Sequence, residues 1–298
     1  MKTYKLAITT GDKFGIGKEL TQKALNFLNP KKEDVLIIGE KIENLNIDYD
    51  FLEIEEENNG KFCYKSLETA CELAKNGTIK ALTTAPVSKL ELHKAGYYFN
   101  GQTEVIESLL AKDSKKAQMI FIADELKVML LTRHCALKEV KLNIDEIVFQ
   151  TEILNNFLIE KYQIKNPKIA LCALNPHCGE EGILGNEEIE ILNPAVKQLN
   201  TKGIDITYPI SADALFARVG KEYLNKQKLS YDAILSCYHD QGLCPIKALA
   251  FDKAINTTIG LDIIRTSPSS GTAYDIAGKN IANPDSMIEA VRLALKLS

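Results

Sequence analysis

The amino-acid sequence predicts an α/β fold in which parallel β-strands are covered by helices. Strand-like apolar runs alternate with helix-like segments from one end of the 298-residue chain to the other. This alternation is typical of strands that are joined by helical crossovers and therefore pair in parallel. No internal repeat, low-complexity tract or long linker interrupts the pattern, so composition marks no boundary between domains.

The predicted elements follow one another closely. Short apolar runs predict the strands, and apolar residues at intervals of three and four predict the helices. Gly77 and Gly203 are expected to end two of the helices, and the polar stretch 53–61 is expected to be a solvated loop. Strands are expected at residues 4–10, 34–39, 79–88, 117–124, 126–134, 168–177 and 231–239, and helices at 11–28, 66–77, 104–110, 144–162, 186–203 and 284–298.

The composition is that of an ordinary globular enzyme, with 45% hydrophobic and 26% charged residues. A net charge of −4 gives no support to a nucleic-acid-binding surface. No apolar run approaches the roughly 20 residues that span a bilayer, and the N-terminus lacks the apolar stretch of a signal peptide. We therefore expect a cytoplasmic protein that binds neither nucleic acid nor membrane.

Seven cysteines are scattered along the chain without CxxC spacing. Cys135 and Cys178 directly follow histidines, so a soft ligand near a metal is one interpretation. The alternative is that the cysteines are small hydrophobic residues in a reducing cytosol, and the odd number and scattered positions favour it.

Three of the four histidines close strand-like runs. His134 ends LKVMLLTRH, His177 ends KIALCALNPH and His239 ends YDAILSCYH. The carboxyl ends of parallel strands share one edge of a sheet, where such folds bind ligands. Three imidazoles at one edge would suit a catalytic metal with an open coordination position, although a single histidine after a strand is commonly just a polar loop residue. His93 lies in a helix-like stretch and is expected to be a surface or packing residue.

The first strand-to-helix turn contains Gly11, Gly15 and Gly17. Such a turn can bring backbone N–H groups close to a phosphate or carboxylate. It does not match the dinucleotide fingerprint, because Leu20 stands where the third glycine belongs. A purely structural turn is the alternative interpretation.

The segment 175–188 combines His177 with glycines and carboxylates between a strand and a helix. Asn186 is expected to cap that helix, with Glu187 and Glu188 in its first turn complementing the helix dipole. Capping accounts for these acids, but it leaves His177 unexplained.

The stretch 237–267 carries the most polar groups among apolar ones. Lys247, Asn256 and Arg265 would suit an anionic substrate, and Arg265 is able to make a bidentate contact with a phosphate or carboxylate. Asp240 is expected either to orient His239 or to act as a base. For each cation taken singly, a solvated surface position is the alternative.

Several segments together resemble the 4-hydroxythreonine-4-phosphate dehydrogenase family of vitamin B6 biosynthesis. They run in the family's order from near the N-terminus to about residue 284, and YHDQGL and the GLDIIRTS segment are highly specific. The matching segments are AITTGDKFGIGKE, TTAPVSK, HKAGYYFNGQTE, NPHCGEEG, YHDQGL followed by Lys247, NTTIGLDIIRTS and SSGTAYDIAGK.

The resemblance implies two α/β/α domains flanking a cleft, as in isocitrate and isopropylmalate dehydrogenases. It implies a cofactor-side domain of residues 1–115 plus 245–298 and a central domain of residues 116–244. It also implies a homodimer in which the third metal-binding histidine comes from the partner subunit, so a site on the sheet edge of one chain would be incomplete.

The resemblance assigns roles to individual residues. It implies NAD as cofactor without a Rossmann fingerprint, and a divalent metal (zinc, magnesium, cobalt or manganese). The implied residues are His134, His177 and His239 for the metal, Gln102, Thr103, Lys247, Asn256 and Arg265 for the substrate, Gly271, Thr272, Ala273 and Asp275 for the cofactor, and Lys247 and Asp240 for catalysis.

The implied activity is oxidation of 4-phosphooxy-L-threonine by NAD, followed by decarboxylation to 3-amino-2-oxopropyl phosphate. The chain departs from the family at Gln102 and Ser270, where histidines are usual, and at Lys13 and Lys18, where prolines are usual. Gln102 is expected to donate a hydrogen bond to the substrate but cannot carry a proton. Three alternatives stay open: another phosphorylated four-carbon hydroxy acid, a metal-dependent hydrolase or lyase that does not use NAD, and a non-catalytic phosphometabolite-binding protein.

Overall fold

The computed structural model describes residues 2–111 and 116–298, which form two compact α/β units. Unit 1 comprises Met1–Ala117 and Ile255–Ser298, and unit 2 comprises Gln118–Ala254. The second boundary falls after helix α8 (His239–Ala250), which a boundary at residue 245 would cut. Each unit has its own sheet and core, and each is described by itself.

The sheet of unit 1 has the strand order β3-β2-β1-β4-β11-β10. All neighbours pair in parallel except β10 and β11, which are antiparallel. The strands are β1 (Tyr4–Thr9), β2 (Val35–Gly39), β3 (Asp50–Glu53), β4 (Ile79–Thr84), β10 (Ile255–Ile259) and β11 (Ile264–Ser267).

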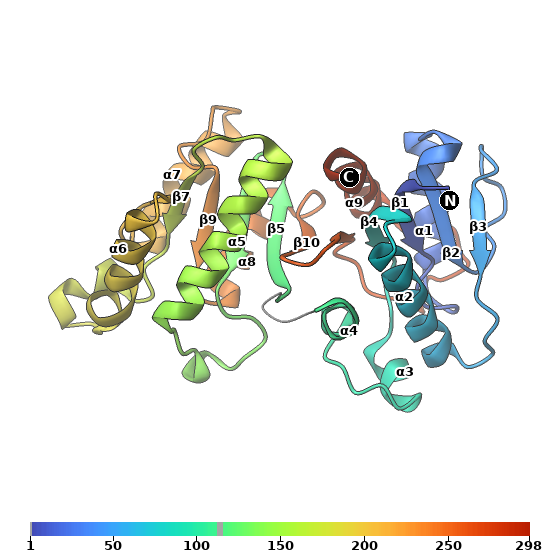
Figure 1. Ribbon diagram of the computed structural model, residues 1–298, viewed down its shortest axis with the longest axis horizontal. Helices are drawn as coiled ribbons and strands as arrows, with labels where there is room; N and C mark the ends of the chain where they lie inside the picture. The colour runs from blue at the N-terminus through green and yellow to red at the C-terminus, as the bar shows by residue number, and fades with distance from the viewer. Residues whose placement is uncertain (1, 112–115) are drawn as a thin grey trace. The chain divides into compact units, whose positions relative to one another are not determined.

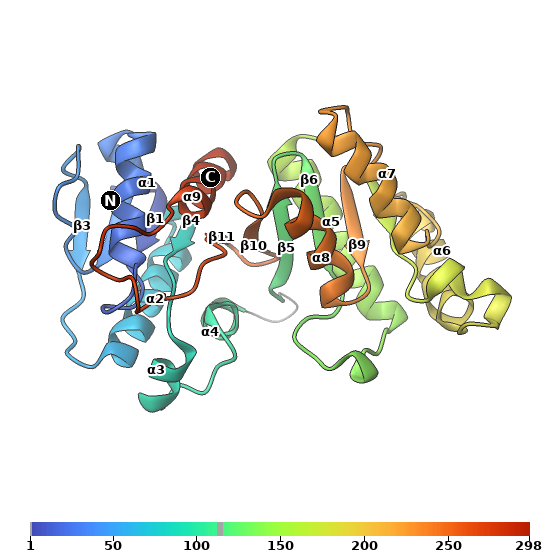
Figure 2. The same ribbon diagram turned by 180° about the vertical axis from the view of Figure 1, so that it is seen from behind.

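Helices cover both faces of this sheet because side chains alternate along each strand. Leu6 and Ile8 of β1 pack in a core with helices α1 and α9, whereas Ala7 packs in a second core with helices α2 and α4. Figure 1 shows α2 on one face, and Figure 2 shows α1 and α9 on the other. The helices are α1 (Gly17–Leu28), α2 (Asn59–Lys75), α3 (Lys89–Lys94), α4 (Gln102–Leu110) and α9 (Asp285–Leu297).

The sheet of unit 2 has the strand order β5-β6-β9-β7-β8, and only the β5–β6 pair is antiparallel. One face is covered by helices α7 and α8, which share a core with the strands, and α5 lies on the opposite face (Figures 1 and 2). The elements are β5 (Gln118–Ala123), β6 (Leu126–Leu130), β7 (Lys168–Leu171), β8 (Asp205–Ile206), β9 (Ala233–Ser236), α5 (Ile144–Tyr162), α6 (Asn193–Thr201), α7 (Ala212–Leu224) and α8.

The structure confirms the α/β class and most of the predicted elements, including the full extent of α5 at 144–162. The expected loop at 53–61 is wrong at its end, because α2 begins at Asn59. The side chain of Asn58 caps this helix by accepting a hydrogen bond from the N–H of Lys61 at 3.0 Å. Gly77 and Gly203 follow α2 and α6 with φ angles of 74° and 80°, as expected for residues that end helices.

The remaining elements are short. Two 3₁₀ turns lie at Lys32–Asp34 and Leu137–Glu139, and a π-helical turn at Glu188–Leu192 leads directly into α6. The segment Pro176–Gly182 also turns, but its backbone is left-handed from His177 to Glu181. His93 lies in α3, where its Nε2 is 2.9 Å from the backbone oxygen of Phe99, which agrees with a packing role.

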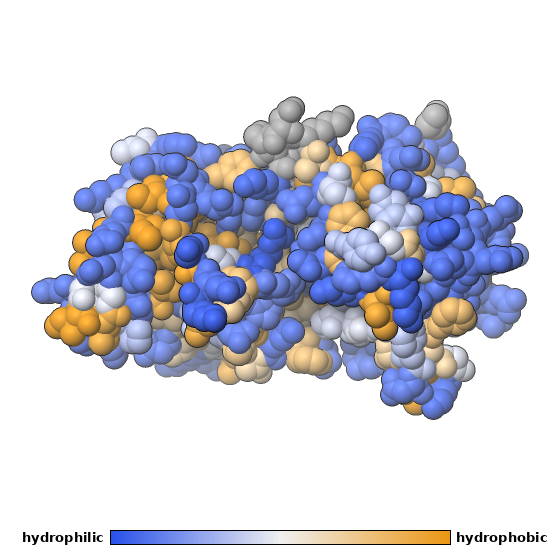
Figure 3. Space-filling view, turned by 90° about the horizontal axis from the view of Figure 1, so that it is seen from below, coloured by the Kyte–Doolittle hydropathy of each residue, from blue (hydrophilic) through white to orange (hydrophobic). Residues whose placement is uncertain are grey.

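Most cysteine side chains are buried, as the sequence favoured. Cys63, Cys71, Cys172 and Cys237 are buried, whereas Cys135 and Cys244 are exposed. Burial raises the pKa of both Cys71 and Cys172 to about 12. The face in Figure 3 is mostly hydrophilic with small apolar patches. Within residues 2–111 and 116–298, no helix is both long and apolar enough to cross a membrane.

Candidate active-site residues in the two units

Unit 2 brings the carboxyl ends of three strands to one edge, as the histidine pattern predicted. Strands β6 and β7 both pair in parallel with β9, which lies between them. His134 follows β6, His177 follows β7, and His239 begins α8 immediately after β9. The rings of His134 and His239 lie 5.5 Å apart, centroid to centroid.

Asp240 contacts the imidazole of His239. Its carboxylate oxygen Oδ1 is 2.7 Å from Nδ1 of His239. A carboxylate only accepts hydrogen bonds, so Nδ1 carries a proton, and in the neutral imidazole Nε2 would keep a lone pair. This is the arrangement by which carboxylates orient metal-binding histidines, and it agrees with the first of the two roles expected for Asp240.

His177 lies apart from the other two histidines. It lines a cavity of about 260 Å³ together with Asp213, Tyr238 and Gln241. Hydrogen bonds from the Ser211 hydroxyl and the Ala214 N–H, with a smaller contribution from nearby His177, hold the pKa of Asp213 below its usual value. Among the described residues, no group of three histidine, cysteine or acidic side chains is close enough to hold a metal. The three histidines therefore do not meet within the described part of one chain.

The backbone that carries His177 is a left-handed turn. From His177 to Glu181 every residue has a positive φ, between 43° and 78°. Left-handed backbone costs roughly 1–2 kcal/mol per non-glycine residue, so the surrounding contacts must compensate. Strain of this kind is concentrated at functional sites.

Glu188 supplies part of that compensation. It is 3% exposed, and its carboxylate accepts hydrogen bonds from the backbone N–H and the side-chain amide of Asn175 at 2.8 and 2.9 Å. Glu187 accepts a further bond from the same amide at 2.7 Å. The side-chain cap expected from Asn186 is therefore wrong, because no side chain caps the helical turn that begins at Glu188. Glu188 does lie in the first turn, as predicted, but both Glu187 and Glu188 bond to Asn175.

The HDQG segment joins two of the strand ends. The side chain of Gln241 accepts from the N–H of Cys237 at 2.7 Å and donates to the carbonyl of Ala173 at 2.7 Å. Gly242 allows α8 to approach the sheet, because a Cβ at this position would lie 2.7 Å from Ser236 Oγ and 2.8 Å from Leu130. The loops that carry His177 and His239 are thereby held together.

Lys247 lies in the last turn of α8, two turns after His239. At 1.5 Å per residue these positions are about 12 Å apart along the helix axis. Its side chain is half-buried. No hydrogen bond or ion pair joins Lys247 to another residue of the described chain.

Unit 1 holds a buried cation on β11. Arg265 is 3% exposed and donates to Thr84 Oγ1 from Nε at 2.9 Å and from Nη2 at 2.6 Å. Its Nη1 donates to Thr103 Oγ1 at 3.3 Å. We call Thr84, Thr103 and Arg265 the Arg265 cluster. Burial lowers the pKa of Arg265 to about 10, so the guanidinium stays charged at neutral pH.

The Arg265 cluster leaves hydrogen-bonding capacity unused. A guanidinium has five N–H donors, and three of the five make the bonds above, which leaves two (5 − 3 = 2). Among the ion pairs of the described residues, none includes Arg265. The carboxylate of Glu104 attracts the guanidinium without forming an ion pair with it. A buried cation that lacks a direct ion pair is costly, so the cluster is suited to bind an anion.

Asn256 and Gln102 lie close to this cluster in the fold. Asn256 pairs with Ser267 across the antiparallel β10–β11 ladder, which places its side chain on the same sheet face as that of Arg265. Gln102 precedes Thr103 in α4, and its Nε2 donates to the carbonyl of Ala85 at 3.1 Å. Asn256 Oδ1 and Gln102 Oε1 are buried and have no hydrogen-bond partner among the described residues.

The segment 269–284, here called the cofactor loop, is bound to the first strand-to-helix turn of unit 1. The carbonyl of Thr272 accepts from the N–H of Ile16 at 3.0 Å. Tyr274 donates to the buried carboxylate of Asp12 at 2.6 Å. Burial and this bond to Asp12 raise the pKa of Tyr274 to about 12. Ala273 has a φ of 43°.

Three further residues of the cofactor loop are described by their exposure and bonding. Gly271 and Asp275 are exposed on the cofactor loop. The hydroxyl of Ser270 is buried without a partner among residues 2–111 and 116–298. The residues predicted to bind the cofactor, Gly271, Thr272, Ala273 and Asp275, therefore lie on one loop together with Ser270.

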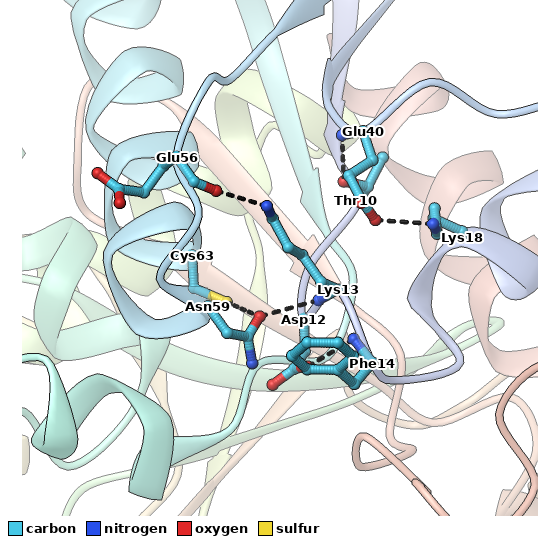
Figure 4. A network of polar contacts seen from close by, with 9 residues as sticks. All are labelled: Thr10, Asp12, Lys13, Phe14, Lys18, Glu40, Glu56, Asn59 and Cys63. Atoms are coloured by element: carbon cyan, nitrogen blue, oxygen red, sulfur yellow. Dashed lines mark hydrogen bonds and ion pairs between the residues drawn. The ribbon is translucent and has the colours of Figure 1, made fainter.

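Figure 4 shows how the glycine-containing turn is held. The backbone N–H of Lys13 donates to Asn59 Oδ1 at 3.0 Å, a bond that proline at this position could not make. Lys18 forms an ion pair with Glu40 at 2.7 Å. At these two positions, where the family usually has the more rigid proline, the lysines make polar contacts with neighbouring segments.

The chain matches a known protein family over nearly its whole length. Residues 7–294 match the family model described as pyridoxal phosphate biosynthetic protein PdxA. The chain belongs to this family. It is 39% identical to the 4-hydroxythreonine-4-phosphate dehydrogenase of Sulfurihydrogenibium sp. (strain YO3AOP1), covering 98% of each chain.

Solved structures of the PdxA family and beyond have the same fold. A crystal structure of a 4-hydroxythreonine-4-phosphate dehydrogenase from Burkholderia phymatum has a TM-score of 0.80 and 32% identity, covering 99% of this chain and 98% of that one. Isocitrate dehydrogenase from Methylococcus capsulatus has a TM-score of 0.56 at 13% identity, covering 99% of this chain and 85% of that one. The latter similarity concerns the fold alone, and it confirms the predicted isocitrate-dehydrogenase-like architecture.

Sequence reasoning found most polar groups at the strand ends but missed Asp213, Thr84 and Gln241. Asp213 follows a short strand that has no long apolar run, and Gln241 was part of a quoted motif without being given a role. Thr84 lies within the strand predicted at 79–88, and nothing in the sequence indicates that its hydroxyl accepts two bonds from a guanidinium.

Proposed function

We propose that this chain is an NAD-dependent and divalent-metal-dependent dehydrogenase of vitamin B6 biosynthesis. It would oxidise 4-phosphooxy-L-threonine and decarboxylate the product to 3-amino-2-oxopropyl phosphate, acting as a cytoplasmic homodimer. The observation that carries the proposal is the Arg265 cluster, a buried guanidinium with two unused N–H donors in a member of the PdxA family. A phosphate monoester matches this charge and geometry.

The residues of this chain have distinct parts in the proposed reaction. Arg265, Thr103 and Asn256 bind the phosphate and fix the substrate, which makes hydride transfer to the nicotinamide effectively intramolecular. The hydride would pass from C3 to NAD, and a base would accept the hydroxyl proton. The ketone would then lose its C1 carboxylate as carbon dioxide, and the enolate left behind would take up a proton at C2 to give the product. Because Asp240 is engaged by His239, Lys247 is the better candidate for proton transfer.

The histidines fit a divalent metal in part. His134 and His239 present neighbouring rings, and the bond from Nδ1 of His239 to Asp240 leaves its Nε2 free to coordinate. We propose that these two and His177 of a second copy would hold the metal. A bound metal would supply Lewis acidity for a hydroxyl and for the enolate that decarboxylation produces.

The cofactor loop fits a dinucleotide. Gly271 and Asp275 are exposed there, and the loop is bound to the turn that precedes α1. Helix α1 has twelve residues and no side-chain cap at its N-terminus, so its first N–H groups are suited to a phosphate. This supports NAD binding without the Rossmann fingerprint.

The decisive experiment is to follow NADH formation at 340 nm with 4-phosphooxy-L-threonine, after chelation and after adding back zinc, magnesium, cobalt or manganese. We expect metal-dependent absorbance that is lost in His177→Ala. A folded, dimeric protein that remains inactive with every metal would reject this substrate. Activity with a related phosphorylated hydroxy acid would then support the same chemistry on another substrate.

A further inference from the structure

Gln102 differs from the family's usual histidine, and the structure fixes which of its two polar atoms is used. The carbonyl of Ala85 only accepts hydrogen bonds, so the atom 3.1 Å from it must be the donor Nε2. Oε1 is therefore the atom left over. It is buried and has no partner among the described residues of the chain.

Gln102 is connected to the Arg265 cluster in two ways, by its peptide bond to Thr103 and by its hydrogen bond to Ala85. Gln102 is followed by Thr103, whose hydroxyl accepts from Arg265. Ala85 is preceded by Thr84, whose hydroxyl accepts twice from the same guanidinium. The bond from Gln102 to Ala85 thus bridges the two segments that position Arg265.

We infer that Gln102 is a specificity-determining residue whose Oε1 accepts a hydrogen bond from an N–H or O–H group of the substrate. This inference rests on the proposed function and reverses the direction expected from the sequence, in which Gln102 donates. A buried acceptor that stays unpaired is costly, so a ligand without a donor at this position binds less tightly. The site therefore selects phosphorylated compounds that carry an ammonium or hydroxyl group.

The same geometry explains how glutamine can replace histidine. A neutral imidazole has one N–H and one acceptor nitrogen. With its N–H directed at the carbonyl of Ala85, a histidine would present an acceptor to the ligand, as Gln102 does. The two side chains are then equivalent in hydrogen bonding as long as the histidine is uncharged.

The test compares three ligands by calorimetry at pH 8, with MgCl2 and without NAD. At this pH the phosphate is dianionic and carries no proton that Gln102 could accept. The ligands are 4-phosphooxy-L-threonine, 2-amino-4-phosphooxybutanoate, which lacks the hydroxyl, and 3-hydroxy-4-phosphooxybutanoate, which lacks the ammonium. For each analogue, the ratio of its Kd to that of the full ligand is measured in wild-type protein and in variants.

In Gln102→Met we expect the ratio for one of the two analogues to fall by about tenfold, the usual worth of a buried hydrogen bond. The analogue that responds identifies the donor. Gln102→His should restore that ratio to within about threefold at pH 8, where an ordinary imidazole is neutral. Gln150→Met is the matched control, because Gln150 is a buried glutamine of unit 2 whose Nε2 donates to the Leu131 carbonyl and whose Oε1 is also unpaired in the described structure.

Two results would overturn the inference about Gln102. Only the second would also overturn the proposed function. Tight binding of all three ligands with both ratios unchanged in Gln102→Met would reject the role of Gln102 and leave the proposed function standing. No binding of any phosphorylated ligand by folded wild-type protein would reject both. Thermal unfolding shows whether each variant folds, and Gln102→Leu replaces the methionine variant if that one does not.

Discussion

At the scale of single residues, Arg265 combines full burial with incomplete pairing. The hydroxyls of Thr84 and Thr103 are neutral, so they compensate only part of the cost of removing a guanidinium from water. A residue kept only for stability would be better replaced by an apolar side chain. Its retention is explained if the missing partner is an anionic ligand.

Arg265→Met should therefore separate stability from binding. We expect the ligand-free variant to be as stable as the wild type or more stable, by up to roughly 4 kcal/mol, because a buried charge is removed. Binding of a phosphorylated ligand should weaken by at least about 100-fold. Thermal unfolding with and without ligand measures both, and a strongly destabilised variant would show instead that Arg265 is a structural cation.

Buried thiols give a second prediction at the residue scale. The pKa of Cys172 is raised by burial to about 12, so the folded state favours the neutral thiol. This contribution to stability is complete below the unfolded pKa of about 8.5–9 and is lost as pH rises toward 12. By pH 10.5 the loss of stability amounts to about 2 kcal/mol. Urea unfolding at pH 7, 9 and 10.5 should show this decline, and Cys172→Ala should reduce it.

At the scale of elements, the sequence predicted strands and helices because the residues that each element buries recur at a fixed spacing along the chain. Helix α5 follows its apolar spacing over its whole length, and the three histidines follow adjacent parallel strands. The loops after the strands could not be predicted in the same way. The left-handed turn at His177 depends on tertiary bonds from Glu188, and Asp213 approaches His177 only through the packing of α7.

The close approach of α8 to its sheet gives a prediction that compares two helical glycines. In Gly242→Ala the new methyl group would meet Ser236, Leu130 and Val128 at 2.7–3.0 Å. Overpacking of this kind costs about 1–3 kcal/mol. In Gly220→Ala the nearest atoms are at 3.5 Å, so the higher helix propensity of alanine should stabilise the protein by up to about 1 kcal/mol. Equal melting temperatures for the two variants would contradict this account.

At the scale of the whole molecule, the two units differ in how the chain builds them. Unit 2 is one continuous segment, Gln118–Ala254, whereas unit 1 needs both ends of the chain. Strand β11, which carries Arg265, pairs in parallel with β4 from the first half of the chain. Unit 1 therefore cannot form before the last strands are available.

This difference predicts that the segment 118–254 folds alone. It has its own core, in which β5, β6, β7 and β9 pack against α7 and α8, and its length is that of an ordinary domain. We expect the isolated segment to unfold cooperatively in urea when followed by circular dichroism. A gradual, non-cooperative change would mean that its core depends on unit 1.

The left-handed turn at His177 has a consequence for chirality. Residues 177–181 hold backbone angles that are the mirror image of an ordinary helical turn, so they suit D-amino acids better than the L-amino acids that the ribosome supplies. A semisynthetic chain with D-glutamate at Glu180 and Glu181, both exposed, should be more stable than the natural protein. At this one loop, the enantiomer of the encoded residue is the better fit to the fold.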